Sequence, residues 1–486
     1  MGSHTTAARA SRLGCRVSRW CLLDAIMSLE AESPLHSSSS SDDFVGFLNT
    51  ELELAASDSA NKDAEVNNDH TNVIEEPGNK RPKLDSEDSV EIEGPRIFST
   101  VEESTGSSLK PKYEDICPPH PGFFKGLCMR CGKLEEDDGS ALAFGYIHKD
   151  LKLGTREIDR LRGADLKSLL REKKLVLILD LDHTLLNSTV VTDVSDAEQY
   201  LLREAESLRN DPERSLLKLD GLHILTKLRP FVHNFLKEAS TMFDMYIYTM
   251  AERSYALEIV KHLDPMGVYF NCKVISQADS TQRYLKGLDV VLKEESHVVI
   301  LDDTKIVWNK HCENLILMEK YHFFASSCRI FGLGIKSLSE LRQDERESDG
   351  TLANILGVLK RVHQTFFDPD LGTDLLSRDV RQVLKTLRQE ILHGCVLVFS
   401  RIFSTTSLPE EEAIWKMAEQ LGAICLKEVD ASVTHIVSLD PGTQKSWWAL
   451  KNNKFLVNPR WIEAANFMWR RQPEENFPVC IPSDKP

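Results

Sequence analysis

Residues 175–188 read Leu-Val-Leu-Ile-Leu-Asp-Leu-Asp-His-Thr-Leu-Leu-Asn-Ser, and this stretch decides the fold. Its five opening apolar residues are typical of a strand that is buried on both faces of a parallel sheet. The run stops at Asp180, and a second carboxylate and a hydroxyl follow at Asp182 and Thr184. Because ligands of such sheets bind beyond the carboxyl ends of the strands, the stretch predicts a site built around these three side chains.

Further apolar stretches alternate with helical patterns downstream, which predicts an α/β fold with a parallel sheet flanked by helices. The expected strands are Leu175–Leu179, Met245–Thr249, Val268–Ser276, Val298–Leu301 and Leu315–Leu317. Polar side chains again fall at strand ends or just beyond them, at Thr249, Lys286 and the pair Asp302-Asp303. Taken singly, each could be an ordinary strand end or a solvated surface residue. Taken in this order, they predict a phosphoryl-transfer site.

In the expected reaction, a carboxylate and a phosphoryl group, both negatively charged, must approach each other. A carboxylate can attack a phosphoryl group only if a cation offsets the repulsion between them, and magnesium with oxygen ligands supplies one. Asp180 is expected to be both nucleophile and magnesium ligand, with Asp303 and the backbone carbonyl of Asp182 as further ligands. The Asp182 side chain is expected to protonate the departing oxygen and later to accept a proton from water.

Three further side chains are expected to complete the phosphate site. Thr249 would donate a hydrogen bond to a phosphoryl oxygen, and Lys286 would neutralise its charge. Asp302 would orient the lysine. Together with Asp180, Asp182 and Thr184, these residues form the predicted catalytic set.

Two ligand pairs precede this region, Cys117-Pro-Pro-His120 and Cys128-Met-Arg-Cys131. Their spacing suits tetrahedral zinc, and the glycine after the second pair permits a tight turn. The alternative is three free cysteines near an unrelated histidine. Four ligands in so short a window favour a structural zinc site.

The length and composition of the chain indicate how many domains it has and which partners it disfavours. The chain has 486 residues and a formal net charge of -16, which allows two or three domains and disfavours adhesion to nucleic acid or to anionic membranes. No stretch approaches the roughly 20 apolar residues of a membrane span. The eleven cysteines favour a reducing intracellular compartment. Residues 1–26 could be a transit segment, but an upstream extension is favoured.

The segment before the Cys/His pairs is rich in Ser, Asp, Glu and Asn, so we expect residues 1–109 to be disordered. Within it, residues 79–84 read Asn-Lys-Arg-Pro-Lys-Leu. A basic cluster of this kind is typical of a nuclear import signal, although such clusters also occur by chance.

This arrangement resembles the haloacid-dehalogenase superfamily. Four motifs narrow the resemblance: Leu-Asp-Leu-Asp-His-Thr at 179–184, Lys-Leu-Arg-Pro-Phe at 227–231, Tyr-Thr-Met-Ala-Glu-Arg at 248–253 and Ile-Leu-Asp-Asp-Thr at 300–304. They resemble the TFIIF-associating phosphatases that act on the C-terminal domain of RNA polymerase II, in their plant branch, where the Cys/His wording also recurs. One departure is Ser276-Gln277, where relatives often carry Ser-Arg, and it would bear on substrate affinity rather than on the magnesium chemistry.

The resemblance implies a haloacid-dehalogenase-like Rossmannoid sheet and a magnesium-dependent serine phosphatase acting through an aspartyl-phosphate. Its substrate would be the phosphorylated polymerase tail, its location the nucleus and its role transcription regulation, with TFIIF as a further partner. Members that hydrolyse small metabolites usually carry a large cap, whereas the space between Thr249 and Lys286 holds only one helix and one strand. The polar insertion from Asn187 to Lys227, with an expected helix at Ala197–Leu208, could wall an open groove for a phosphopeptide.

A second class of function is a nonenzymatic nuclear scaffold that keeps the fold to bind phosphopeptides. The joint presence of Asp180, Asp182, Lys286 and Asp303 favours the enzyme, because a scaffold needs neither a nucleophile nor its acid.

The C-terminal segment resembles a BRCT domain through Gly-Ala at 422–423, Thr-His-Ile-Val at 434–437 and Arg-Trp-Ile-Glu-Ala at 460–464. In members that bind phosphopeptides, the positions of Ser400 and Lys445 hold the phosphate. Arg401 stands where a glycine commonly follows, which favours an interaction module without phosphate binding. We therefore expect a disordered acidic region at 1–109, a zinc knuckle at 114–134, a catalytic domain at 135–345, a helical connector at 346–390 and a BRCT domain at 391–486.

Overall fold

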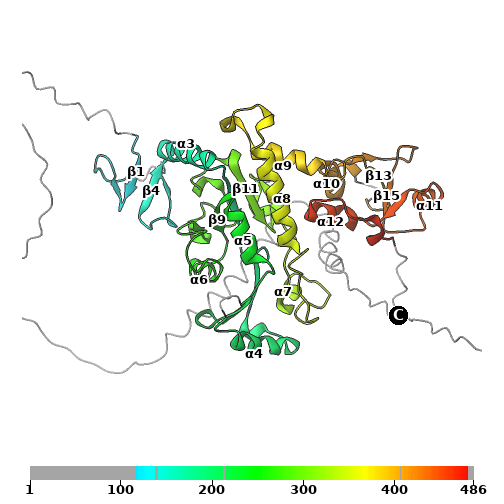
Figure 1. Ribbon diagram of the computed structural model, residues 1–486, viewed down its shortest axis with the longest axis horizontal. Helices are drawn as coiled ribbons and strands as arrows, with labels where there is room; N and C mark the ends of the chain where they lie inside the picture. The colour runs from blue at the N-terminus through cyan, green and yellow to red at the C-terminus, as the bar shows by residue number, and fades with distance from the viewer. Residues whose placement is uncertain are drawn as a thin grey trace, which may run out of the picture. The chain divides into compact units, whose positions relative to one another are not determined.

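The computed structural model of the chain describes residues 117, 119–136, 139, 141–211, 214–404 and 407–479. The expectations for residues 1–109, disorder and the import signal among them, lie outside the described residues. From Pro119 onward the described residues belong to one compact unit, coloured cyan to red in Figure 1. None of its helices combines the length and the hydrophobicity that a membrane span requires.

A five-stranded parallel sheet forms the centre of the catalytic part, with strand order β10-β9-β5-β11-β12. The strands are β5 (Leu175–Leu179), β9 (Phe243–Tyr248), β10 (Val274–Ile275), β11 (Val298–Asp302) and β12 (Leu315–Leu317). All residues of β5 and β11 are buried, as the apolar runs predict for central parallel strands. The predicted α/β fold class is confirmed.

The strand expected at Val268–Ser276 is present only as the short β10. The carboxylate of Asp264 accepts the amide hydrogens of residues 268–270 at 2.7 to 2.9 Å, so these amides are not available to a sheet ladder. The segment before β10 is therefore a turn.

Helices cover the central sheet and bury its two faces in separate cores. They include α3 (Thr155–Arg171), α5 (Val232–Ser240), α6 (Arg253–Leu263), α8 (Thr351–Phe366) and α9 (Val380–Gln389). Alternate residues of β5 point to opposite faces, so Leu177 and Leu179 lie in the core beneath α5 and α8, whereas Val176 and Ile178 lie in the core beneath α3.

The insertion that follows Asp180–Thr184 forms an antiparallel sheet of order β6-β8-β7 with one α-helix. Its elements are β6 (Leu186–Val190), α4 (Gln199–Ser207), β7 (Leu216–Leu219) and β8 (Ile224–Leu228). The helix was expected, whereas the strands were not, because polar residues interrupt their apolar pattern: Ser188 lies in β6, and Thr226 and Lys227 lie in β8.

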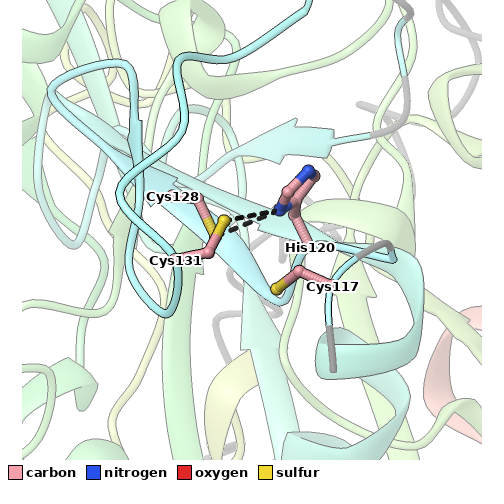
Figure 2. Close-up of side chains that lie close together, drawn as sticks. All are labelled: Cys117, His120, Cys128 and Cys131. Atoms are coloured by element: carbon pink, nitrogen blue, oxygen red, sulfur yellow. Dashed lines mark hydrogen bonds between the residues drawn. The ribbon is translucent and has the colours of Figure 1, made fainter. Parts of the chain in front are cut away.

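A second small sheet, of order β2-β1-β4-β3, precedes the catalytic sheet along the chain. Its strands are β1 (Gly122–Phe124), β2 (Leu127–Cys128), β3 (Ala141–Ala143) and β4 (Leu151–Gly154). The edge strand β2 carries Cys128, one of the four Cys/His residues drawn in Figure 2. The sheet runs across the boundary expected at residues 134 and 135, and β4 leads directly into α3.

The C-terminal part has the strand order β14-β13-β15-β16, all parallel. Its elements are β13 (Val396–Ser400), α10 (Ala413–Gln420), β14 (Ile424–Leu426), β15 (His435–Ser438), α11 (Gln444–Lys451), β16 (Phe455–Val457) and α12 (Arg460–Met468). Gly422 has a φ of +91°, and a Cβ there would meet the carbonyl oxygen of Gln389 at 1.8 Å, which explains the glycine in this turn.

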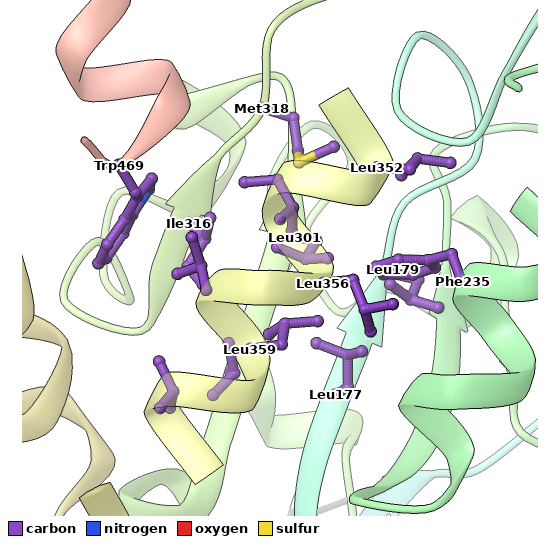
Figure 3. Close-up of a cluster of buried hydrophobic side chains, with 14 of the residues drawn as sticks. Leu177, Leu179, Phe235, Leu301, Ile316, Met318, Leu352, Leu356, Leu359 and Trp469 are labelled. Atoms are coloured by element: carbon purple, nitrogen blue, oxygen red, sulfur yellow. The ribbon is translucent and has the colours of Figure 1, made fainter. Parts of the chain in front are cut away.

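Helix α8 connects the two parts through a shared apolar core. Figure 3 shows Leu352, Leu356 and Leu359 of α8 among side chains of the central sheet, with Trp469 at one flank. Trp469 follows α12, is 4% exposed, and stacks under the guanidinium of Arg388 from α9 at 4.9 Å. The connector helices thus hold the BRCT-like part against the catalytic sheet.

Candidate active site

The parallel pairing of β5 with β11 brings three carboxylates together at one edge of the sheet. Leu179 pairs with Leu301, so Asp180 comes to lie beside Asp302 and Asp303. Their carboxylate oxygens lie within 4.8 Å of one another, and none of the three residues is more than 8% exposed. Such a cluster of hard oxygen ligands is the kind that Mg²⁺ prefers.

Lys286 lies inside this cluster. Its Nζ donates to Asp180 Oδ1 and to Asp302 Oδ2, each at 2.6 Å. Trp308 Nε1 donates to the same Asp302 oxygen at 2.8 Å. Burial lowers the pKa of the Lys286 ammonium, but the charges of the two carboxylates outweigh burial and raise it above its usual range.

The carboxylates differ in their affinity for protons. Burial raises the pKa of Asp180 well above its ordinary value, and the charge of Lys286 offsets that rise only in part. Burial also acts on Asp303, but the charges of Lys320 and His183 outweigh it and hold the pKa of Asp303 far below its usual range. Asp303 therefore stays ionised.

Thr184 and Thr249 occupy different parts of the site. Thr184 Oγ1 donates to Asp303 Oδ1 at 3.0 Å, so it orients that carboxylate. Thr249 directly follows β9, the neighbour of β5, and is 2% exposed. Its Oγ1 accepts the amide hydrogen of Ala251 at 3.0 Å, which leaves the hydroxyl hydrogen to donate elsewhere.

Asp182 is held by a tyrosine that sequence reasoning missed. Tyr255 Oη, from α6, donates to Asp182 Oδ1 at 2.7 Å, and Ser188 Oγ lies 2.7 Å from the same phenol oxygen. Burial raises the pKa of Asp182 to about 6, although the hydrogen bond from Tyr255 opposes the rise. In the sequence, Tyr255 stands among apolar helical residues and is indistinguishable from a core aromatic.

A buried arginine fixes the turn that carries the first motif. Arg229 is 1% exposed and forms an ion pair with Glu345 at 2.8 Å. Its Nη1 also donates to the carbonyl oxygens of Thr184 and Glu319, both at 3.0 Å. The guanidinium thereby ties the turn after β5 to the segment after β12. The sequence offered only the motif at 227–231 as a signal.

The four Cys/His side chains gather around β1 and β2 (Figure 2). Their ligand atoms, from Cys117, His120, Cys128 and Cys131, lie within 4.8 Å of one another. His120 Nδ1 is 3.2 Å from Cys128 Sγ and 3.4 Å from Cys131 Sγ.

Ser400 and Lys445 have separate partners. Ser400 is 4% exposed, and its hydroxyl forms a 2.8 Å hydrogen bond with Thr443. Lys445 Nζ donates to the carbonyl oxygen of Lys427 at 2.6 Å. Arg401, with a φ of 54°, forms an ion pair with Asp440 at 3.0 Å.

Known proteins match both parts of the chain. Residues 175–363 match the family described as NLI interacting factor-like phosphatase, and residues 387–465 match the BRCA1 C Terminus (BRCT) domain. The chain is 50% identical to the Arabidopsis thaliana protein named RNA polymerase II C-terminal domain phosphatase-like 4, over 93% of this chain and 97% of that protein. It is 30% identical to an RNA polymerase II C-terminal domain phosphatase of Caenorhabditis elegans, over 76% of this chain and 57% of that protein.

A solved structure of an RNA polymerase II CTD phosphatase has a similar fold. The structure of Fcp1, described as an essential RNA polymerase II CTD phosphatase, superposes with a TM-score of 0.51 at 25% identity, over 66% of this chain and 100% of that chain. Fold and relatives together define a protein phosphatase of the haloacid-dehalogenase type with a C-terminal BRCT domain. The chain belongs to the family of RNA polymerase II C-terminal domain phosphatases.

Proposed function

We propose that this chain is a magnesium-dependent phosphatase that removes phosphate from serines in the heptad repeats of the RNA polymerase II tail. The observation that carries the proposal is the buried ammonium of Lys286 between Asp180 and Asp302, beside Asp303. A buried ammonium among buried carboxylates at strand ends is costly to maintain, and such clusters concentrate at catalytic sites.

The residues fit a magnesium ion. Asp180 and Asp303 are the proposed side-chain ligands, with the backbone carbonyl of Asp182 as a third. Bound Mg²⁺ would supply the positive charge that offsets repulsion between the nucleophile and the phosphate. Asp302 already accepts hydrogen bonds from Lys286 and Trp308, which suits it to orient the lysine instead.

The remaining steps fall to the protein. A carboxylate oxygen of Asp180 attacks phosphorus, and the bond to the seryl oxygen breaks as Asp182 gives that oxygen a proton. Water then attacks the aspartyl-phosphate while Asp182 takes its proton, which releases phosphate and restores Asp180. Lys286 and Thr249 stabilise the charge on the phosphoryl oxygens.

The substrate assignment rests on the names of the relatives and on the small size of the segments that could form a cap. Between Thr249 and Lys286 the structure has α6, β10 and the short 3-10 helix Gln277–Asp279, and the insertion before Lys227 is a small sheet with one α-helix and short 3-10 turns. Neither segment forms a large cap domain, which supports a peptide substrate. A nuclear location and transcription regulation follow from the proposed substrate, and TFIIF remains a proposed partner.

The BRCT domain would hold the repetitive tail near the site and so raise its effective concentration. Phosphate contacts by Ser400 and Lys445 remain a prediction of the BRCT resemblance. They require both side chains to exchange their present partners, Thr443 and the Lys427 carbonyl. We therefore favour a protein-interaction role.

The test is phosphate release from a serine-phosphorylated heptad peptide, with and without magnesium, by wild type, Asp180→Asn and the exposed control Asp193→Asn. We expect magnesium-dependent turnover in wild type and in the control, and its loss in Asp180→Asn. Absence of turnover in wild type, with peptide binding retained, would favour the nonenzymatic scaffold.

A further inference from the structure

The Cys/His cluster near β1 has the composition and the size of a metal site. Three sulfur atoms and one imidazole nitrogen converge from the segments on either side of β1 (Figure 2). Zinc–sulfur bonds of about 2.3 Å place tetrahedral sulfur ligands roughly 3.8 Å apart. The observed limit of 4.8 Å among the four ligand atoms requires only a small contraction around an ion.

The turn after β2 has the backbone that a metal-binding knuckle needs. Gly132 adopts a φ of +72° and donates its amide hydrogen to the Cys128 carbonyl at 3.0 Å. Cys128 N in turn donates to the Lys133 carbonyl at 2.8 Å, which closes the turn. The amide of Arg130 points at Cys128 Sγ at 3.4 Å. The backbone thus presents Cys128 and Cys131 on the same side of the turn.

The segment has little apolar core to hold this shape. Strands β1 and β2 contain three and two residues, and Phe124, Leu127, Met129 and Leu134 are each at least 39% exposed. Short strands with so little buried surface are marginally stable without a metal or a disulfide. Neither Cys128 nor Cys131 forms a disulfide bond, so no disulfide takes that role for the turn after β2.

We propose that Cys117, His120, Cys128 and Cys131 bind one structural Zn²⁺ ion, which fixes this segment on strand β4 of the catalytic part. Four protein ligands complete a tetrahedron and leave no position for substrate, so the ion is structural. His120 would bind through Nδ1, the ring nitrogen that faces the sulfurs.

The bound segment also supports the start of α3. Gly154 N donates to the Pro121 carbonyl at 3.0 Å, and a Cβ on Gly154 would meet the His120 carbonyl oxygen at 2.5 Å. Leu153, just before α3, shares a core with Val176 of β5, the strand that leads to Asp180. Loss of the ion is therefore expected to loosen β4 and the α3 side of the sheet.

Metal analysis of the full chain, purified under reducing conditions with zinc, tests the proposal. We expect about one zinc per chain in wild type and in Cys272→Ser, an exposed cysteine outside the cluster, and less than about 0.2 in Cys128→Ser. Zinc-free wild type, or unchanged zinc in Cys128→Ser, would overturn the site. Zinc that can be removed without lowering the melting temperature would overturn its structural role.

A second measurement covers the case in which Cys128→Ser does not fold. Cobalt-loaded wild type should show thiolate-to-cobalt charge-transfer absorption, and His120→Cys, which keeps four ligands, should increase it by about one third because it adds a fourth thiolate. Absence of this absorption in wild type, or no increase in His120→Cys, would contradict the proposed ligand set.

Discussion

The hydrogen bond from Tyr255 to Asp182 offers a direct test of how the proposed general acid is held. Tyr255→Phe removes one oxygen, which donates to Asp182 at 2.7 Å and lies 2.7 Å from Ser188 Oγ. The ring stays in its core, where it is 9% exposed, so we expect little change in stability. Without the bond, the Asp182 carboxyl is free to rotate away from the departing oxygen.

The magnitude follows from the kind of bond that is lost. A hydrogen bond to a charged group contributes about 1.5–3 kcal/mol, which corresponds to a rate loss of about 10- to 100-fold on a phosphoserine peptide. A positioned general acid contributes about 10²–10⁴-fold in all, so the loss should not exceed that range. On p-nitrophenyl phosphate, whose phenolate departs without a proton, only the later role of Asp182 as base is affected, so we expect a smaller loss than on the peptide.

The assay measures kcat and KM on both substrates for wild type, Tyr255→Phe and the control Tyr200→Phe. Tyr200 also loses one hydrogen bond, to the Ser339 carbonyl at 2.9 Å, but it lies in the insertion. We expect kcat to fall more for the peptide than for p-nitrophenyl phosphate, and only in Tyr255→Phe. An unchanged kcat on the peptide, or a change confined to KM, would refute the assignment of Tyr255 as the residue that positions Asp182.

Substitutions at three other positions are expected to change the free energy of unfolding. Trp469→Ala should lower the free energy of unfolding, measured in urea, by about 3–5 kcal/mol, because the ring is buried between the BRCT domain and α8; a loss below about 1 kcal/mol would contradict that packing. Gly422→Ala should cost about 3 kcal/mol or more through its clash with Gln389, whereas Gly394→Ala, with a φ of +80° and open space around it, should cost only about 1–2 kcal/mol in the same assay. Burial lowers the pKa of His435 from 6.5 to about 4. Below pH 6.5 the unfolded chain therefore binds a proton at His435 that the folded chain does not, so the free energy of unfolding falls as the pH decreases from 6.5 toward 4. Unfolding in urea should require about 2 kcal/mol less at pH 5 than at pH 7, and His435→Asn should flatten that slope.

The central strands could be predicted from the sequence because burial on both faces leaves an unbroken apolar run. Strand β5 agrees with its prediction at both ends, and β11 extends one residue beyond its own, to Asp302. The strands of the insertion carry mixed polar residues, and their partners lie elsewhere in the chain. Pairing such as that of β6 with β8 gives no local periodicity to read.

Only some residues of the candidate site could be predicted from the sequence. Carboxylates at strand ends could be predicted, because parallel strands end at one edge of a sheet. Tyr255 reaches Asp182 across 73 positions of sequence, and Arg229 reaches Glu345 across 116. No short window of sequence contains both members of such a pair, so only the folded chain reveals which side chains hold the proposed catalytic residues and the turn that carries them.

The balance of charge at the sheet edge gives a physical reason for the proposed magnesium requirement. Three buried carboxylates, Asp180, Asp302 and Asp303, face two ammonium groups, since Lys286 bonds the first two and Lys320 bonds the third. Carboxylates outnumber ammonium groups, so the protein alone presents an excess negative charge that repels a phosphate dianion. One divalent cation offsets this excess. A basic residue in place of the cation would offset part of it, but it would hydrogen-bond Asp180 and so compete with phosphorus for the attacking oxygen, as Lys286 already does in part. Oxygen ligation by a metal leaves a second carboxylate oxygen free, and this difference is a physical reason to propose magnesium, rather than a third lysine, beside the proposed nucleophile Asp180.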